Sequence, residues 1–218
     1  MELSYWQSRW KKGLIGFHLN QPHHSLESFF KPYLKENDLV YLPLCGKTPD
    51  IKWFANQNCR VQGTEISEIA IQDFFKEHNL NPTVSQSHNT TLYRADNIEL
   101  RQADFLKDAK ILQSTADFIY DRAALVALPP QKRPGYIEKA IQILKPGGYY
   151  ALVAFTYDQD EMTGPPFSVP LQEISAYFDA FVKIQFRETE ILETLKKFQE
   201  RGLSSMSEQL YLFQKPQI

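Results

Sequence analysis

The chain has 218 residues, of which 43% are hydrophobic and 23% are charged, close to the averages of globular proteins. That length allows one well-buried α/β core and is short for two, so we expect a single domain over residues 1–218. The formal net charge of −2, with acidic and basic residues intermixed, argues against a nucleic-acid or anionic-lipid partner and favours a small-molecule substrate.

The first segment, residues 1–16, carries Trp6 and Trp10 but no continuous apolar run of the kind found in signal peptides. No later stretch approaches the roughly 20 apolar residues of a membrane-spanning helix. Cys45 and Cys59 are too few for a disulfide framework and lack the CxxC spacing. We therefore expect a cytoplasmic protein with reduced thiols and no membrane partner.

The next part of the chain predicts a β-α-β-α unit. Residues 38–44 form an apolar run typical of a buried strand, and the Thr-Pro-Asp sequence that opens 48–57 predicts a helix start with Thr48 as the N-cap. Residues 59–65 predict the second strand. A second helix is expected from Ser67 until the Asn-Leu-Asn-Pro sequence at 79–82.

The alternation continues to the end of the chain. The polar segment 82–94 indicates a loop or a poorly paired hairpin, and Lys-Pro-Gly-Gly at 145–148 a tight turn. Strands are expected at 98–102, 116–121, 149–155, 181–187 and 209–213, and helices at 134–144, 171–178 and 191–201. This pattern is typical of a doubly wound, mostly parallel α/β sheet, and its last two strands could form an antiparallel edge.

Ligands of doubly wound sheets bind beyond the carboxyl ends of the strands, where the strand order reverses. The first strand ends at Leu44, and Gly46 lets the backbone come close to a ligand there. Glu65 ends the second strand about 20 residues later, where an acid accepts the hydroxyls of a ribose. The alternative for Glu65 is a helix-capping or solvated acid, although Ser67 already offers a cap.

The turn after the first strand lacks the glycines of a dinucleotide-binding loop. It has Gly46 alone, whereas G-x-G-x-x-G needs further glycines, and Pro49 removes an N–H group that a phosphate could use. Lys47 and Thr48 match the end of a Walker loop, but the upstream glycine is missing. A nucleoside without a diphosphate, such as S-adenosylmethionine, therefore fits this turn better than NAD or ATP.

A series of short motifs spans nearly the whole chain: Trp6-Gln7-Ser8-Arg9-Trp10, Gly16-Phe17-His18, Pro43-Leu44-Cys45-Gly46-Lys47, Lys52-Trp53-Phe54-Ala55, Gly63-Thr64-Glu65-Ile66-Ser67, the run Tyr-Asp-Arg-Ala-Ala-Leu-Val-Ala at 120–127, and Gly164-Pro165-Pro166-Phe167. Together they resemble the thiopurine S-methyltransferase family. The resemblance implies a Rossmann-like, seven-stranded methyltransferase sheet, S-adenosylmethionine as the methyl donor, and an aromatic or heterocyclic thiol as the acceptor. Bacterial members are also associated with methylation of selenium and tellurium species.

The resemblance also implies roles for residues near the amino terminus and at the strand ends. The positions that match cofactor contacts are Trp10, Leu44, Glu65 and Arg122. Trp6 and Phe17 match aromatic positions in a lid segment, residues 1–24. The indole of Trp10 could attract the sulfonium by about 0.5 to 2 kcal/mol. The other explanation for Trp6 and Trp10 is an apolar stripe that packs a terminal helix onto the core.

Two further strand ends carry candidate residues. Asp104 and Phe105 stand where methyltransferases commonly contact the adenine, although Asp104 could instead cap the following turn. Arg122 is the candidate catalytic residue, because a guanidinium can hold the methionine carboxylate or stabilise an acceptor thiolate. The alternative is a structural ion pair between Arg122 and Asp121 at the strand end.

For the acceptor pocket we nominate Trp6, Phe17, Pro166 and Phe167, with Lys197 and Arg201 on the late helix. The Pro-Pro-Phe turn is stiff enough to present an apolar wall, but it could equally be a surface Ω-loop. Lys197 stands where some relatives carry an arginine, which weakens the case for bidentate contact with a purine.

Methyl transfer from a sulfonium is an in-line displacement that needs alignment more than acid–base groups. No Ser-His-Asp, Cys-His or metal-binding pattern is evident, and the histidines, including His23 and His24, are expected at the surface. We expect a monomer that binds no metal. Two alternatives stay open: a methyltransferase for selenium or tellurium oxyanions or halide, and a non-catalytic nucleoside-binding domain. The missing glycines disfavour an NAD-dependent oxidoreductase.

Overall fold

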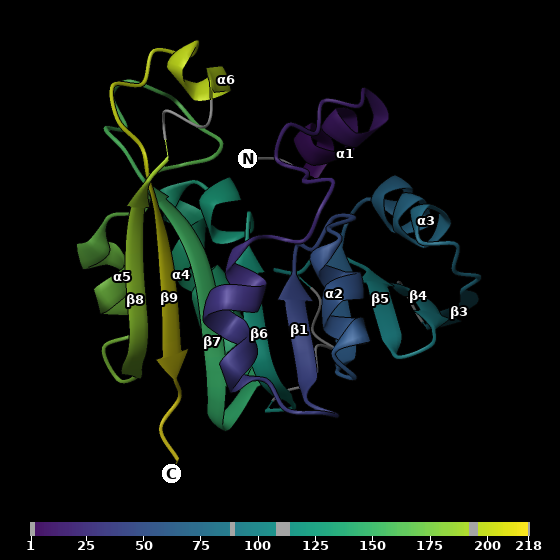
Figure 1. The fold of residues 1–218 in the computed structure, drawn as a ribbon. Coiled ribbons are helices and arrows are strands. Elements are labelled where there is room, and N and C mark those ends of the chain that lie inside the picture. Colours follow the sequence, from purple (N-terminus) through teal and green to yellow (C-terminus); the bar gives the residue numbers. More distant parts are fainter. Residues whose placement is uncertain (1–2, 88–89, 108–113, 192–195, 218) are drawn as a thin grey trace.

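The computed structural model describes residues 3–87, 90–107, 114–191 and 196–217, and these residues build one mixed sheet of nine strands (Figure 1). The strand order is β3-β4-β5-β2-β1-β6-β7-β9-β8. The strands are β1 (Leu39–Pro43), β2 (Arg60–Glu65), β3 (Thr83–Ser87), β4 (Thr90–Ala95), β5 (Ile98–Gln102), β6 (Ala116–Arg122), β7 (Leu144–Thr156), β8 (Val182–Glu190) and β9 (Ser207–Gln214).

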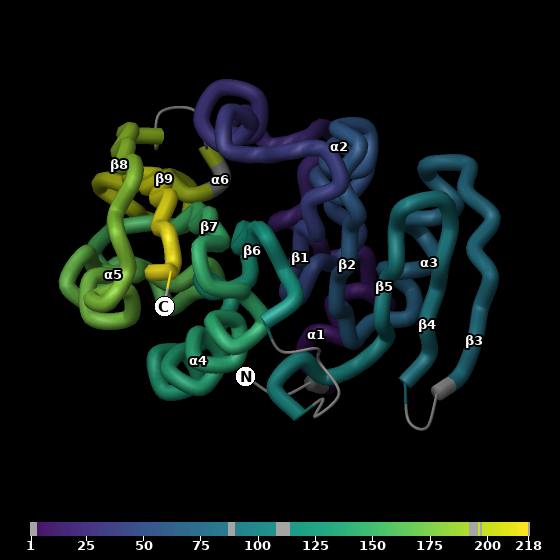
Figure 2. Tube along the Cα trace, turned by 90° about the horizontal axis from the view of Figure 1, so that it is seen from below, coloured from purple at the N-terminus to yellow at the C-terminus, as the bar shows by residue number. Residues whose placement is uncertain are grey.

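Helices cover both faces of this sheet and stand over the carboxyl ends of its parallel strands (Figure 1). They are α1 (Leu3–Lys11), α2 (Asp50–Asn56), α3 (Glu68–Glu77), α4 (Arg133–Ile143), α5 (Leu171–Tyr177) and α6 (Lys196–Gln199), with a π-helical turn η1 (Leu26–Phe30) and the 3₁₀ turns η2 (Lys31–Tyr33), η3 (Leu125–Ala127) and η4 (Pro130–Lys132). Figure 2 shows η1 and α2 on one face and α4 and α5 on the other. No helix within the described ranges has the length and apolar character needed to cross a membrane.

Two apolar layers hold the helices to the sheet. Phe30, Phe54 and Phe74 belong to the layer under η1, α2 and α3. Tyr136 and Ile174 belong to the layer under α4 and α5. Every residue of β1 is buried, as expected for a central parallel strand with helices on both sides. The predicted α/β architecture is therefore confirmed.

The sheet has nine strands rather than the seven that the resemblance implies, because the polar segment 82–94 forms the hairpin β3-β4. β4 pairs antiparallel with β5, and β3 lies at the edge. Val84 on β3 is 54% exposed, whereas Tyr93 on β4 is buried and stacks on Phe75 of α3. One half-buried strand and one exposed edge strand need few apolar residues, so the segment is polar in sequence.

The last two strands form the antiparallel edge that the sequence predicts. β9 runs antiparallel to both β7 and β8 and lies between them, so the outermost strand is β8. The predicted turn at 145–148 is part of β7, where a register shift against β6 and a φ of 76° at Gly147 accommodate the extra residues. Of the predicted helix 191–201, the described residues contain only the short helix α6. The N–H group of Ile191 instead donates to the carbonyl of Met206.

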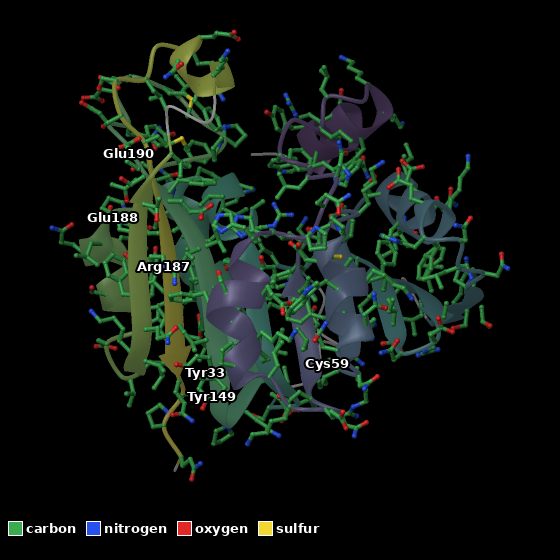
Figure 3. All side chains as sticks on the ribbon, viewed as in Figure 1. Tyr33, Cys59, Tyr149, Arg187, Glu188 and Glu190 are labelled. Carbon is green, nitrogen blue, oxygen red and sulfur yellow. The ribbon has the colours of Figure 1, made fainter. Side chains whose placement is uncertain are left out.

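The amino-terminal edge of the parallel strands is closed by packing. Tyr33 lies against Tyr149 there, with ring centroids 5.5 Å apart (Figure 3). Cys59, labelled in the same view, is a free buried cysteine, and burial raises the pKa of its thiol to about 11. A thiol held in its protonated form is a poor nucleophile.

Candidate active site

A cavity of about 380 Å³ opens beyond the carboxyl ends of β1, β2 and β6. Figure 1 shows α1 standing over this edge of the sheet. The predicted site residues that line the cavity are Trp6, Trp10, Phe17, Leu44, Glu65, Asp104, Phe105 and Arg122. Its volume lies in the range of small-molecule sites. The fold thus brings together residues from five separate parts of the chain.

A sharp turn follows β1 at the floor of the cavity. Leu44 and Gly46 both have left-handed backbone conformations, with φ of 47° and 55°. A side chain at Gly46 would place its Cβ 3.1 Å from Cζ2 of Trp10. Glycine is needed there because the turn requires positive φ and because the indole packs directly on the backbone.

Glu65 is buried in the cavity wall and connects the ends of β1 and β2. Its Oε2 accepts the N–H of Gly46 and its Oε1 accepts the N–H of Ser67, both at 2.8 Å. Burial raises the pKa of Glu65, and these backbone donors oppose the rise. The helix cap is Ser67, whose hydroxyl accepts the N–H of Ala70. Each carboxylate oxygen has a further lone pair, so Glu65 can accept two more hydrogen bonds from a ligand.

Asp104 and Phe105 form another part of the wall. Asp104 Oδ1 accepts the N–H of Leu106 at 3.1 Å, so the residue caps its turn and lines the cavity at the same time. Phe105 is buried between Tyr41 and Tyr136, with centroid distances of 6.2 and 5.3 Å. The two alternatives considered for Asp104 are therefore compatible.

The amino-terminal aromatic residues form one continuous wall. The ring of Phe17 lies 5.6 Å from Trp6 and 5.6 Å from Trp10, in edge-to-face geometry with both. Trp10 is 6% exposed. The segment after α1 folds back, so that Phe17 contacts both indoles. The aromatic stripe on α1 is therefore a packing surface and a wall of the cavity at the same time.

Arg122 ends β6 and is held by buried partners from α2 and the preceding turn. Its Nε donates to Asp50 Oδ2 at 2.7 Å and its Nη2 to Thr48 Oγ1 at 2.6 Å. The Thr48 hydroxyl donates in turn to Asp50 at 2.8 Å. Within the residues that the structure describes, Nη1 of Arg122 has no hydrogen-bond partner. One face of the guanidinium is thus fixed, and Nη1 is free to bind a ligand.

The pair between Arg122 and Asp121 that was considered as the alternative is not formed. Asp121 accepts the hydroxyls of Tyr136 and Tyr150, both at 2.8 Å, and the N–H of Leu125 at 3.0 Å. Successive side chains of a strand point to opposite faces of the sheet, so neighbouring residues cannot meet. Arg122 faces the helix α2 and Asp121 faces α4.

The nominated residues of the late loop lie apart from this cavity. Pro166, Phe167 and Arg201 are not among the described residues that line it. The N–H of Phe167 donates to the carbonyl of Val126 at 2.7 Å, which fixes the loop beside η3. Arg201 Nη1 lies 3.3 Å from the carbonyl of Pro165, next to the same loop. Lys197 belongs to α6, but its side chain lies outside the described part of the structure.

His23 is not a surface residue, contrary to the sequence prediction. Its side chain is 8% exposed, with Nε2 3.0 Å from Glu208 Oε1 and Nδ1 2.7 Å from the Ser25 hydroxyl. The exposed His24 lies 2.9 Å from the other oxygen of Glu208, and the N–H of His23 donates to Asp50 at 2.8 Å. Glu208 is 185 residues from His23, so the sequence offers no local signal for the contact.

His23, His24 and Glu208 could in principle hold a metal ion, since their ligand atoms lie within 4.8 Å of one another. Both imidazoles already bind the carboxylate directly, and His23 also binds Ser25. The same contacts are sufficient to explain the cluster as an anchor that holds the end of the amino-terminal segment to β9.

Comparison with known proteins gives a consistent result over the whole length. A family model described as thiopurine S-methyltransferase matches residues 1–216. The chain belongs to the thiopurine S-methyltransferase family. The thiopurine S-methyltransferase of Vibrio campbellii is 41% identical over 212 residues, covering 96% of this chain and 97% of the relative. That of Aliivibrio fischeri is 39% identical over 216 residues, covering 98% and 100%.

Solved structures support the fold of this thiopurine S-methyltransferase family member. A Burkholderia thailandensis 1,6-didemethyltoxoflavin-N1-methyltransferase with bound S-adenosylhomocysteine aligns with a TM-score of 0.67 at 13% identity, over 98% of this chain and 86% of that one. An S-adenosylmethionine-dependent methyltransferase from Methanosarcina mazei aligns with a TM-score of 0.66 at 18% identity, over 91% and 100%. At these identities the likeness establishes the methyltransferase fold.

Several residues of this family member's site were not predicted individually. His18 and Thr48 line the cavity, and Asp50 orients Arg122. His18 belongs to the Gly-Phe-His motif, so the motif could have marked it as a candidate site residue. In the sequence, Asp50 looks like an ordinary acid in the first turn of a helix. Only the tertiary structure brings it to Arg122.

We expect Glu208→Gln to lower the free energy of unfolding at neutral pH and to make that free energy depend less on pH in the acid range. Burial tends to raise the pKa of Glu208, but the hydrogen bonds and charges of His23 and His24 lower it overall. A lowered folded-state pKa contributes stability above the unfolded value, and this contribution is lost as pH falls through the folded value. Urea unfolding at neutral and acidic pH measures both effects. A variant that loses stability with acid as steeply as the native chain would contradict this assignment.

Proposed function

We propose that this chain transfers the methyl group of S-adenosylmethionine to the sulfur of a small aromatic or heterocyclic thiol and releases S-adenosylhomocysteine. The main support for the proposal is that Glu65, the aromatic residues of the amino-terminal segment, and Arg122 all line one cavity. Membership of the thiopurine S-methyltransferase family, whose relatives carry that name, supports the choice of donor and acceptor.

The donors and acceptors of the wall fit the cofactor. We infer that Asp104 accepts from the adenine amine while Phe105 flanks the ring, and that Glu65 accepts the ribose hydroxyls. The turn at Leu44 would let the methionine arm pass close to the backbone. Trp10 would place its indole by the sulfonium, which a π face attracts. When bound, the cofactor supplies an electrophilic methyl group.

We place the acceptor beside Arg122 and Phe17, which both line the cavity. The free Nη1 of Arg122 is suited to the methionine carboxylate or to a thiolate, and Trp6 with Phe17 provides an apolar surface for an aromatic ring. The rate then depends on holding the sulfur nucleophile in line with the methyl group. The negative charge on the attacking sulfur and the positive charge on the sulfonium largely cancel in this step. The surrounding apolar wall is therefore compatible with it.

The proposal also includes the segments beyond the cavity wall. Residues 1–24 would act as a lid within a single domain, held at its end by the contact of His23 with Glu208. Pro166, Phe167, Lys197 and Arg201 would extend the acceptor pocket from the neighbouring loop and α6. We also propose a monomer as the active unit. Two free cysteines are consistent with the reducing cytoplasm.

The acceptor class is tested by comparing initial rates with an aromatic thiol, with selenite and tellurite, and with iodide, each at saturating S-adenosylmethionine. We expect the aromatic thiol to be methylated at least about tenfold faster than the ions, a difference of about 1.4 kcal/mol in barrier. Turnover of the ions with negligible turnover of the thiol would replace the proposed acceptor with the inorganic one.

A further inference from the structure

His18 lines the cavity and follows Phe17 directly in the chain. Its backbone N–H donates to the carbonyl of Ile15 at 2.8 Å, which fixes the turn that carries it. Within the part of the chain that the structure describes, its half-buried imidazole has no hydrogen-bond or ion-pair partner. Such a ring has a nitrogen lone pair available to a ligand.

Four charged groups from four different elements act electrostatically on this imidazole. They are Lys47 on the turn after β1, Glu77 on α3, Arg122 on β6 and Asp50 on α2. Burial lowers the pKa of His18 most, the charges of Lys47 and Arg122 lower it further, and Glu77 and Asp50 act in the opposite direction. The net effect is a lowered pKa, so His18 is neutral near physiological pH.

The two acids are already engaged by the two cations. Lys47 Nζ lies 2.5 Å from a Glu77 oxygen, and Arg122 binds Asp50. Neither carboxylate is therefore positioned to compete for a proton on the imidazole. Among the groups around this end of the cavity, His18 combines an accessible lone pair with an ordinary pKa close to neutrality.

We propose that His18 is the proton acceptor for the thiol substrate, an assignment that rests on the proposed function. The S–H proton moves to a ring nitrogen while a sulfur lone pair forms the new bond to the methyl carbon. The bond between that carbon and the sulfonium sulfur breaks, and its electron pair stays on the sulfur of S-adenosylhomocysteine. The imidazolium then releases its proton to water through the exposed part of the ring.

This role makes a prediction that depends on the acceptor. A thiol that is protonated at the assay pH needs a base, whereas an electron-poor aromatic thiol that is already ionised does not. Removing His18 should therefore slow the first acceptor and spare the second. A role in packing or in cofactor binding would affect both acceptors alike.

The test compares His18→Asn and His18→Gln with the native chain on both acceptors at saturating cofactor. We expect kcat for the protonated thiol to fall about 100-fold, the lower limit for a lost general base, and kcat for the ionised thiol to fall less than about threefold. His78→Asn is the matched control, because His78 is also half-buried but lies at the end of α3. Raising the pH through the pKa of the first thiol should restore most of the lost rate.

Equal losses with the two acceptors, or no loss with either, would overturn the proton-acceptor role. A fall in cofactor affinity with unchanged kcat would also overturn it and assign His18 to the methionine carboxylate. Thermal unfolding of both variants separates these results from a failure to fold. If the native chain methylates neither thiol, the proposed function itself fails, and that result is distinct from all of the others.

Discussion

Replacing Glu65 with alanine is expected to weaken S-adenosylhomocysteine binding about 100-fold or more. A hydrogen bond to a charged group contributes about 1.5 to 3 kcal/mol, and the carboxylate would accept two from the ribose. Each 1.4 kcal/mol is a tenfold change in Kd. Isothermal titration measures the change directly. An affinity within about threefold of the native value would remove Glu65 from the cofactor site.

The same substitution removes the acceptor for two buried backbone N–H groups, those of Gly46 and Ser67. Leaving such groups unpaired costs about 1 to 3 kcal/mol each, so the free energy of unfolding must be measured alongside the affinity. Glu65→Gln is the matched control, since it keeps the shape and loses the charge. Because burial raises the pKa of Glu65, native affinity should also weaken as the pH falls through that value, whereas Glu65→Gln should show no such dependence.

Arg122→Ala is expected to lower the free energy of unfolding by about 3 to 5 kcal/mol, the usual effect of removing one partner from a buried ion pair. Asp50 would remain fully buried with its carboxylate deprived of the guanidinium. We expect turnover to fall as well, because Nη1 of Arg122 would no longer face the ligand. Chemical denaturation and steady-state kinetics on the same preparation measure the two effects.

The double variant Arg122→Met with Asp50→Asn separates stability from activity. It removes both charges together, so most of the lost stability should return while turnover stays low. The N–H of His23, which donates to Asp50, would still find the asparagine oxygen. Recovery of turnover in this variant would show that Arg122 acts through the fold alone and has no direct role in the reaction.

The sequence predicts one part of the site because local signals place it at a strand end. Glu65 ends a strand and precedes the N-cap Ser67, which is enough to locate it at the carboxyl edge of a parallel sheet. The aromatic residues of the amino-terminal segment are visible as a stripe, and the family resemblance assigns that stripe to the site. These inferences depend on short-range periodicity and on known helix-start chemistry.

Partners that are distant in sequence could not be predicted in this way. Arg122 pairs with Asp50 and not with its neighbour Asp121, because strand pleating sends adjacent side chains to opposite faces. The burial of His23 depends on Glu208 near the other end of the chain. The polar segment 82–94 left a loop and a poorly paired hairpin open as alternatives, because the exposed edge strand β3 and the half-buried strand β4 need little apolar sequence.

The central claim is that the cavity transfers a methyl group rather than merely binding a nucleoside. The direct measurement uses S-adenosylmethionine labelled in its methyl group and one aromatic thiol, with mass spectrometry of both products. We predict that the label is found on the sulfur of the thiol, with one equivalent of S-adenosylhomocysteine for each thioether formed. Saturable binding of S-adenosylmethionine with no labelled thioether would contradict it.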